Sequence, residues 1–333
     1  MNKTFIRTVP VWMLLLLLIV AIAASMLTGA YPMSAFHAAK VLFSGGDLKE
    51  IAVMTLIRPP RILVAMLAGC ALGLSGAALQ GVMRNPLVSP DLVGVSSGAA
   101  FGSVLAIMAG LSSFVMVGFA LFGGILALAC TFALAAIMQV RNGVGLILAG
   151  FFVGAFFLAG IGFCLYMDPT GSAPGISYWM MGTFRGADPL KAEILGAAVL
   201  LGGGVLMGLR WRINLLSLND QDAAALGVNV SLVRWLVITI VALLVAAQVA
   251  VSGVVGWVGL IVPHIARMLV GADHRRLLPA SAFIGGVFVL GLDDLTRSVI
   301  QGEIPVSVLA AFIGTPFICI LFWKAKNKGW GEQ

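Results

Sequence analysis

The hydrophobic residues of this chain form long runs with few polar residues between them. Residues 11–24, for example, are apolar at every position. A helix that crosses about 30 Å of hydrocarbon needs about 20 such residues, at a rise of about 1.5 Å per residue. A transmembrane β-barrel would instead alternate polar and apolar residues in segments of about 10 residues. The pattern therefore predicts an all-α membrane protein.

Uncharged runs, and the turn residues between them, define the predicted spans. The uncharged stretch 92–140 is too long for one crossing and divides near Gly110. The run 235–266 could form one helix or two, because Ser252-Gly253 offers a tight turn inside it. With that run divided, the predicted spans cover approximately residues 10–29, 62–83, 92–109, 115–140, 143–166, 190–209, 232–251, 253–270, 277–296 and 304–323.

Basic residues decide between nine and ten spans, because lysine and arginine are enriched in cytoplasmic loops. Ten spans place 13 of the 20 basic residues inside and 7 outside, whereas nine spans place 8 inside and 12 outside. The first 30 residues resemble a cleavable signal peptide, but keeping them as a helix puts Lys3 and Arg7 on the cytoplasmic side. We therefore expect ten transmembrane helices in a single transmembrane domain over residues 1–333. Both termini are then cytoplasmic, as is a polar loop at 210–231.

Composition supports this location and excludes other classes of protein. The chain is 61% apolar and 10% charged, whereas soluble proteins have about 45–50% and about 25%. Its net charge of +7 comes from basic residues that are scattered singly, so a nucleic-acid partner is not expected. The four cysteines lie in separate apolar runs, which argues against a disulfide framework or a metal site. We expect a multi-pass protein of the cell inner membrane, surrounded by lipid.

The chain lacks residues with which membrane proteins bind ATP or couple to ion gradients. It contains no Gly-x-x-x-x-Gly-Lys-Ser/Thr phosphate loop, so any ATP hydrolysis belongs to a partner and no cofactor is expected here. An ion-coupled secondary transporter usually keeps an ionisable group near the middle of the membrane. The aspartates that could serve this purpose all fall at predicted span ends or in loops: Asp91, Asp168, Asp188, Asp220, Asp222 and Asp273. This alternative is therefore less favoured.

One short motif could indicate an intramembrane serine protease. Gly73-Leu74-Ser75-Gly76 lies within the second predicted span. Small residues at this spacing are more often contacts between packed helices. Catalysis would also need a histidine base inside the membrane, and only His264, near a predicted cytoplasmic end, is a candidate. We expect helix packing at this motif and no catalytic residue.

Several more specific groups of residues occur in order along the chain, beginning just before the second predicted span. They are Arg58-Pro59-Pro60-Arg61, Gln80–Pro90, Gly94–Ala99, Tyr178–Gly182, Leu226–Val228, Gly259–Arg267, Asp273–Arg275 and Ile304–Val306. Together they resemble the FecCD-type permeases, the membrane subunits of ABC importers for iron-siderophores, haem and vitamin B12. The resemblance extends from about residue 50 to the C-terminus.

This resemblance implies a type II ABC importer permease fold of ten helices and a set of partners. The permease would work as a pair, expected to be a homodimer. Two ATP-binding cassette subunits would bind ATP and Mg²⁺ on one side, and a periplasmic or lipid-anchored substrate-binding protein would dock on the other. The expected cargo is a metal chelate, first of all an iron-siderophore. Haem, cobalamin and molybdate remain alternatives.

By the same resemblance, three arginines on the outer face receive acidic residues of the binding protein: Arg58, Arg61 and Arg297. Charge-assisted bonds between arginine and carboxylate suit a contact that orients a partner and then releases it. Two alternatives remain open. The side chains of Arg58 and Arg61 could extend to lipid headgroups. Arg297 could pair within its own helix with Asp293 or Asp294.

On the inner side, the resemblance implies a coupling segment and a gate. The coupling segment, a pair of short helices that fits the ATPase, would use Asp220, Asp222, Ala223, Ala224 and Gly227. Ser217 or Asn219 could cap its first helix. The cytoplasmic gate would be formed by Asn85, Leu87, Asn142 and Gly143. The pathway itself would run along 149–154 and 310–314, which hold no charge, so cargo selection would belong to the binding protein.

Overall fold

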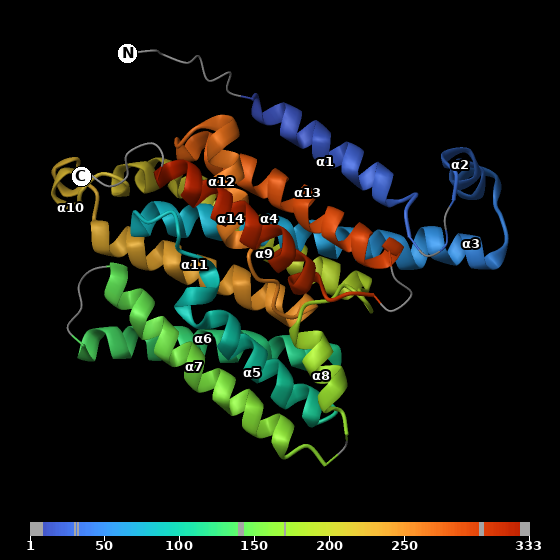
Figure 1. Cartoon of the computed structure of the whole chain (residues 1–333), viewed down its shortest axis with the longest axis horizontal. Helices are drawn as coiled ribbons and strands as arrows, with labels where there is room; N and C mark the ends of the chain where they lie inside the picture. Colours follow the sequence, from blue (N-terminus) through green and yellow to red (C-terminus); the bar gives the residue numbers. More distant parts are fainter. Residues whose placement is uncertain are drawn as a thin grey trace.

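The structure, a computed structural model, describes residues 9–29, 31, 33–138, 143–169, 171–299 and 303–326. These residues form helices joined by short loops, and they include no β-strand. Most of the long helices run along the length of the molecule (Figure 1). The helices are α1 (Val11–Ser25), α2 (Ala35–Ser44), α3 (Leu48–Ala52), η1 (Val53–Ile57), α4 (Arg58–Met83), η2 (Pro90–Val93), α5 (Val95–Met108), α6 (Ser113–Ile137), α7 (Gly143–Tyr166), α8 (Ala173–Met180), α9 (Pro189–Leu216), α10 (Asp220–Ala225), α11 (Val230–Ser252), α12 (Val258–Val270), α13 (His274–Val299) and α14 (Val306–Lys326).

Helices of membrane-spanning length and composition account for most of the chain. Among the described residues, six are long and apolar enough to cross a membrane: Leu48–Met83, Ser113–Ile137, Gly145–Tyr166, Pro189–Leu216, Val230–Ser252 and His274–Ser298. Four shorter apolar helices are Val11–Ser25, Val95–Met108, Val258–Val270 and Val306–Ile320. Each of these helices overlaps one of the ranges predicted from the sequence. An all-helical membrane protein is thus confirmed, while the count of ten crossings stays a prediction.

Two helices extend well beyond their predicted limits. The second span was expected to begin at residue 62, yet the helix is continuous from Leu48 through the π-helical turn η1 into α4. Pro59 and Pro60 stand just after η1, where the change from π-helical to α-helical hydrogen bonding accommodates residues without a backbone N–H. Helix α9 continues past residue 209 to Leu216. Arg210 and Arg212 do not interrupt it, because their side chains are exposed on its surface. It therefore covers the start of the predicted loop at 210–231.

The ambiguous run 235–266 is divided, as the ten-span interpretation requires. Helix α11 ends at Ser252 and α12 begins at Val258. Gly253 has a φ of 71°, and Trp257 adopts a φ of 70° immediately before α12. Two positive φ values within five residues turn the chain sharply, so α12 returns toward the end of the molecule where α10 lies (Figure 1).

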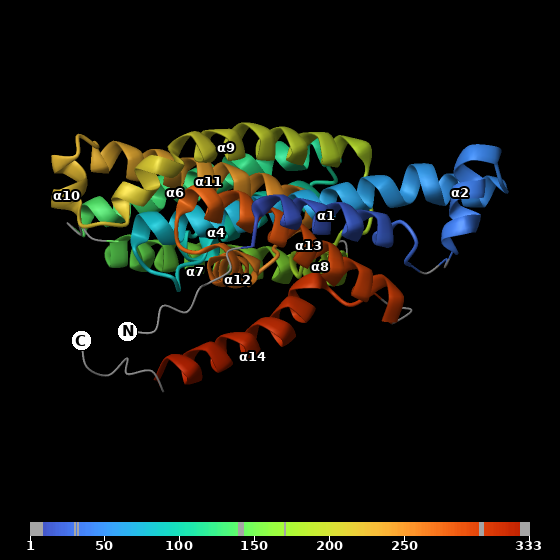
Figure 2. The ribbon, with the colours of Figure 1, turned by 90° about the horizontal axis from the view of Figure 1, so that it is seen from above.

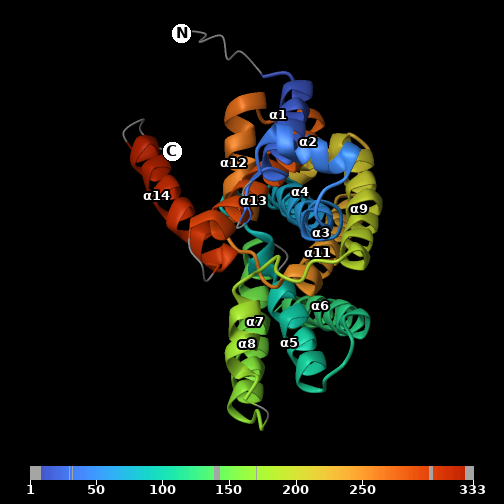
Figure 3. The same cartoon turned by 90° about the vertical axis from the view of Figure 1, so that its right-hand side faces the viewer.

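Helix α4 is the centre of the bundle and packs against α9, α11, α12 and α13, while α1 packs on α13 (Figure 3). Small residues let α13 approach it backbone to backbone. A Cβ on Gly69 would lie 2.0 Å from the carbonyl oxygen of Gly285, and one on Gly73 would lie 2.1 Å from that of Ser281. Close approach through small residues is how helices pack when lipid removes the hydrophobic drive for association. By contrast, α14 diverges from the bundle (Figure 2).

Replacing Gly285 by alanine is expected to destabilise the protein, because the new Cβ would lie 2.2 Å from the carbonyl oxygen of Gly69. Overpacking of this kind costs about 1–3 kcal/mol. Gly291 lies on the same helix with no heavy atom within 4 Å of its Cβ position. We expect Gly285→Ala to lower the midpoint temperature of unfolding in detergent and Gly291→Ala to leave it unchanged or raise it slightly. Equal midpoints would contradict this packing.

Candidate functional site

The three arginines predicted for the outer face lie at one end of the bundle. Arg58 and Arg61 are in the first turn of α4, and Arg297 is near the end of α13. The Arg58 guanidinium donates to the backbone carbonyls of Met26 and Tyr31 in the connection that follows α1. Arg58 thereby fixes this connection, and only 4% of its surface is exposed.

Arg61 forms the centre of a buried charge cluster. Its Nη2 lies 2.8 Å from Oδ1 of Asp293, and its Nη1 lies 3.0 Å from Oε1 of Glu303. The side chain of Asp293 is fully buried, whereas that of Glu303 is 24% exposed. The Arg61–Asp293 pair joins α4 to α13. Glu303 adds the segment that leads into α14.

Arg297 has the intrahelical partners that its spacing allows. It forms an ion pair with Asp294, and its Nε lies 3.6 Å from Oδ2 of Asp293. It also donates to the carbonyl oxygen of Ser25 at 2.9 Å, which ties α13 to the end of α1. All three arginines are therefore occupied by partners within the chain. Their contact with a binding protein stays a prediction.

The sequence alone did not reveal two members of this cluster. Asp293 was noticed only as a neighbour of Arg297, and its bond to Arg61 spans more than two hundred positions. Glu303 lies in a loop and carries no motif of its own. Its φ of 43° is unusual for a residue with a side chain, which marks a constrained position. That conformation is visible only in the folded chain.

At the opposite end, α4 leads into the loop predicted as a gate. Oδ1 of Asn85 accepts the backbone N–H of Leu87 at 2.9 Å, and Leu87 is 40% exposed. The Gln80 amide donates to the carbonyl of Val88 at 3.3 Å, while its oxygen accepts from Arg267 of α12 at 2.9 Å. This loop is thus braced against α12. Of the other two predicted gate residues, Asn142 lies outside the described residues, and Gly143 begins α7.

The predicted coupling segment contains one short helix, α10, where a pair was expected. Asn219 caps it by accepting the N–H of Asp222 at 2.7 Å, which selects Asn219 over Ser217. Gly227 ends it with a φ of 80°. Ala223 is fully buried against the bundle, whereas Asp222 and Ala224 are exposed. The helix therefore presents a small polar surface at the end of the molecule.

Asp220, the first residue of α10, is held by two arginines. Its Oδ1 lies 2.9 Å from Nη2 of Arg84, at the end of α4, and 3.0 Å from Nη2 of Arg234, on α11. Neither arginine was predicted to belong to the site. Arg84 stands beside the gate motif in the sequence, but its spacing gives no indication of which carboxylate it meets.

A polar junction next to α10 fixes the turn between α12 and α13. The backbone N–H of Arg275 donates to Oδ1 of Asp273 at 2.9 Å, and this bond holds the pKa of Asp273 below its usual value. The Asn214 amide of α9 also donates to Asp273. The carboxylate accepts these bonds in its charged form. Their contribution to the stability of the turn is therefore present at neutral pH and is lost as pH falls through the lowered pKa.

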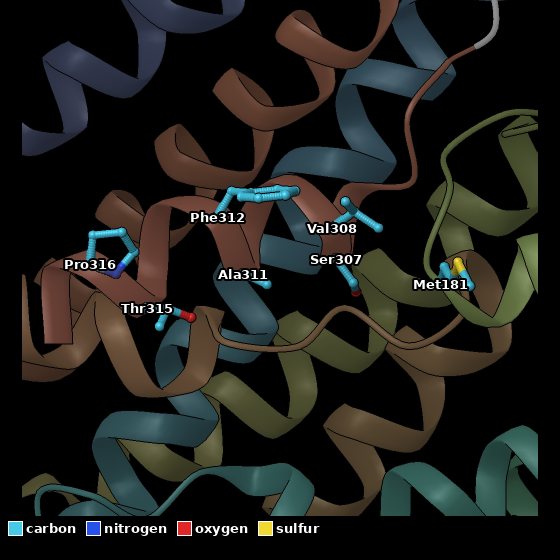
Figure 4. Close-up of a pocket in the computed structure, with 7 residues that line it drawn as sticks. All are labelled: Met181, Ser307, Val308, Ala311, Phe312, Thr315 and Pro316. Atoms are coloured by element: carbon cyan, nitrogen blue, oxygen red, sulfur yellow. The ribbon is translucent and has the colours of Figure 1, made fainter. Parts of the chain in front are cut away.

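An open apolar cavity of about 610 Å³ lies along α14. Its lining comes from one face of α14 with one methionine opposite (Figure 4): Met181, Ser307, Val308, Ala311, Phe312, Thr315 and Pro316. The Ser307 hydroxyl is already bonded to the carbonyl of Val254 at 2.7 Å. Phe312 is 71% exposed, and Phe151 and Phe152 on α7 are exposed as well. The walls offer a passing solute no charged group.

The possible protease motif is a packing contact. Ser75 is fully buried, and its Oγ has no hydrogen-bond partner among the described residues. A Cβ on the neighbouring Gly76 would lie 2.0 Å from the carbonyl oxygen of Gly259. A serine nucleophile needs a base within hydrogen-bond reach, and this serine has none in the described chain.

Comparison with known proteins identifies the family of this chain. The chain matches the FecCD transport family over residues 17–324. The chain belongs to that family. It is 40% identical, over 96% of each chain, to the molybdate import system permease protein MolB of Haemophilus influenzae. It is 36% identical to the hemin transport system permease protein HmuU of Yersinia pestis, over 82% of this chain and 83% of that one.

A solved structure is similar over the same extent. An inward-facing metal-chelate type ABC transporter is 39% identical, with a TM-score of 0.85 over 94% of this chain and 98% of that one. The protein is thus a multi-pass membrane permease of an ABC importer and a component of a complex with ATPase and binding-protein partners. As a permease subunit it has no catalytic role, and the family predicted from the sequence is confirmed.

Asp293→Asn is expected to destabilise the bundle, because it leaves two buried arginines without a shared carboxylate. Removing one partner of a buried pair costs about 3–5 kcal/mol. Asp188→Asn is the matched control, since Asp188 pairs with Lys191 at 3.8 Å and its side chain is 42% exposed. Thermal unfolding in detergent should show a large decrease in midpoint temperature for the first variant and a small one for the second. Similar decreases would assign Asp293 a minor structural role.

Proposed function

We propose that this chain is the permease of a homodimeric ABC importer, with ten spans in one transmembrane domain and both termini in the cytoplasm. Two ATPase subunits bind ATP and Mg²⁺ and drive alternating access. The observation that supports this most strongly is the near end-to-end similarity to an inward-facing ABC transporter. In Figure 1, the described ends of α1 and α14 both point toward the end that holds α10, which agrees with this topology.

The proposed pathway runs between the two copies, along α14 and α7. The face of α14 is apolar, exposed and hollowed. A wall without charge lets a hydrated or chelated solute pass without binding it tightly, as transport requires. Cargo selection is therefore assigned to the binding protein.

Inside, α10 with Asp222 and Gly227 is proposed to fit a groove of the ATPase. Its exposed surface of Asp222 and Ala224 allows close contact with a partner. The loop with Asn85 and Leu87 is proposed to close the pathway on this side. These assignments rest on the family resemblance and on the exposed position of both segments.

For the cargo, we propose a metal oxyanion of the molybdate type before a metal chelate such as an iron-siderophore or haem. MolB matches this chain over nearly its full length at 40% identity. A probable iron chelatin permease of Helicobacter pylori matches at 34% over 84% of this chain. This order reverses the one expected from the sequence alone.

Uptake by the purified complex tests both parts of the proposal. The permease, its ATPase and its binding protein are reconstituted in proteoliposomes, and uptake of radiolabelled molybdate and of an iron-siderophore is measured with and without ATP. We expect molybdate uptake that requires ATP and the binding protein. Uptake of the chelate alone would overturn only the cargo. Uptake driven by an ion gradient without the ATPase would overturn the importer.

On the outer side, we propose that a carboxylate of the binding protein replaces Glu303 at Arg61. Arg61 holds two carboxylates, and only Glu303 is partly exposed. Breaking this partly exposed pair costs less than breaking the buried one with Asp293. Arg61 can therefore accept an outside partner while Asp293 keeps it in place.

Glu303→Gln is then expected to strengthen docking of the binding protein several-fold, because Arg61 loses its internal competitor. Asp188→Asn, which removes another exposed carboxylate paired with a lysine, should leave the dissociation constant unchanged. Both constants can be measured by surface plasmon resonance at low and high salt. Unchanged or weaker docking of Glu303→Gln would remove Arg61 from the contact.

A further inference from the structure

The gate loop and the coupling helix are joined by one side chain, that of Arg84. Its Nη2 lies 2.9 Å from Oδ1 of Asp220, and its Nη1 donates to the carbonyl of Leu218 at 3.0 Å. The planar guanidinium fork thus bonds two points of the segment that carries α10. The backbone of Arg84 begins the loop that contains Asn85 and Leu87. A displacement of α10 can therefore reach this loop directly through Arg84.

The backbone of Arg84 is itself constrained. It ends α4 in the left-handed conformation, with a φ of 52° and a ψ of 32°. Glycine adopts this conformation at no steric cost, whereas residues with a side chain are strained there. The chain direction after α4 depends on this one residue. A force on the Arg84 side chain therefore acts at the point where the gate loop leaves α4.

The far end of the same loop is held differently. Val88 is bonded to Gln80, which in turn accepts from Arg267 of α12. Between these two anchors, Asn85 accepts the N–H of Leu87 and keeps the loop folded. The loop is therefore attached to α10 at its start and, at its end, to Gln80 of α4, which Arg267 of α12 in turn holds. Movement of α10 relative to α4 and α12 would pull on the start of the loop while its end is held, and Leu87 lies between these two points.

Asp220 has a second partner, which allows the role of Arg84 in the gate loop to be tested separately from the attachment of α10 to the bundle. It also pairs with Arg234 of α11, at 3.0 Å. Arg234 fixes α10 to α11, and among the described residues it has no hydrogen bond or ion pair with the gate loop. Removing either arginine takes one positive charge from Asp220, but only the loss of Arg84 disconnects the loop.

We propose that Arg84 is the positioning residue that transmits the movement of the coupling helix to the cytoplasmic gate. This rests on the proposed function, in which α10 is the contact for the ATPase. The Arg84 and Asp220 side chains are 39% and 46% exposed, and exposed ion pairs contribute little to folding stability. Arg84→Gln is therefore expected to fold and to assemble with the ATPase.

The test follows the gate directly in the assembled complex. Leu87→Cys is introduced after the four native cysteines are replaced by serine, and a nitroxide is attached to each copy. Pulsed electron paramagnetic resonance measures the distance between the two labels with and without ATP and vanadate. Cargo transported per ATP hydrolysed is measured in proteoliposomes on unlabelled variants.

The variants are Arg84→Gln, Arg84→Lys and Arg234→Gln. Arg212→Gln is the matched control, because Arg212 is exposed and makes no ion pair among the described residues.

We expect the parent complex and Arg212→Gln to change label distance on nucleotide binding. In Arg84→Gln the change should fall to less than half, and cargo per ATP should fall about fivefold, within the usual range of coupling between sites. Arg84→Lys, which can still reach Asp220, should recover part of the response, and Arg234→Gln should keep most of it. Arg84→Gln that responds like the parent would overturn this inference, as would an equal loss in Arg234→Gln. A parent complex without ATP-dependent uptake would overturn the proposed function itself.

Discussion

The close approach of α4 and α13 determines where the functional groups of this permease lie. In a membrane, lipid chains are as apolar as leucine, so helices associate through close packing and polar contacts. Gly69 and Gly285 bring the two backbones together, and the same pair of helices then places Arg61 opposite Asp293. A larger residue at this contact would separate the helices and leave both charges without partners. Packing and charge pairing here depend on each other.

Charged residues are few, and they gather at the two ends of the bundle. At the end proposed to face outward they join α1, α4 and α13 through largely buried groups, and the partly exposed Arg61–Glu303 pair adds the approach to α14. At the inner end they join α4, α10 and α11 through more exposed pairs. A buried pair resists separation, whereas an exposed pair exchanges partners easily. The inner network is thus the one suited to repeated rearrangement during a transport cycle.

Much of the architecture could be predicted, because uncharged runs and turn residues are local properties of the sequence. The break between α11 and α12 followed from the distribution of basic residues, and the family followed from motifs in order. The end of α9 could not be found this way, because Arg210 and Arg212 are typical of a loop although they lie on the exposed surface of a continuing helix. The partners of Arg61 and Arg84 were also missed. Bonds between residues far apart in the sequence depend on the three-dimensional arrangement, which no spacing rule supplies.

Helix α14 is tethered at its first turn, where the N–H groups of Val306 and Ser307 donate to Gly182 and Met181 at 2.9 and 3.1 Å. Farther along, Gly314 and Phe317 still lie against Ile261 and His264 of α12, and the last part of the helix diverges from the bundle (Figure 2). A helix of 21 residues is about 30 Å long, so a rotation about its first turn would displace its far end strongly. A tilt of roughly 10° about that turn would move its far end by about 5 Å. A small rotation beside Glu303 would thus become, at the far end of the helix, a displacement comparable to the width of a solute.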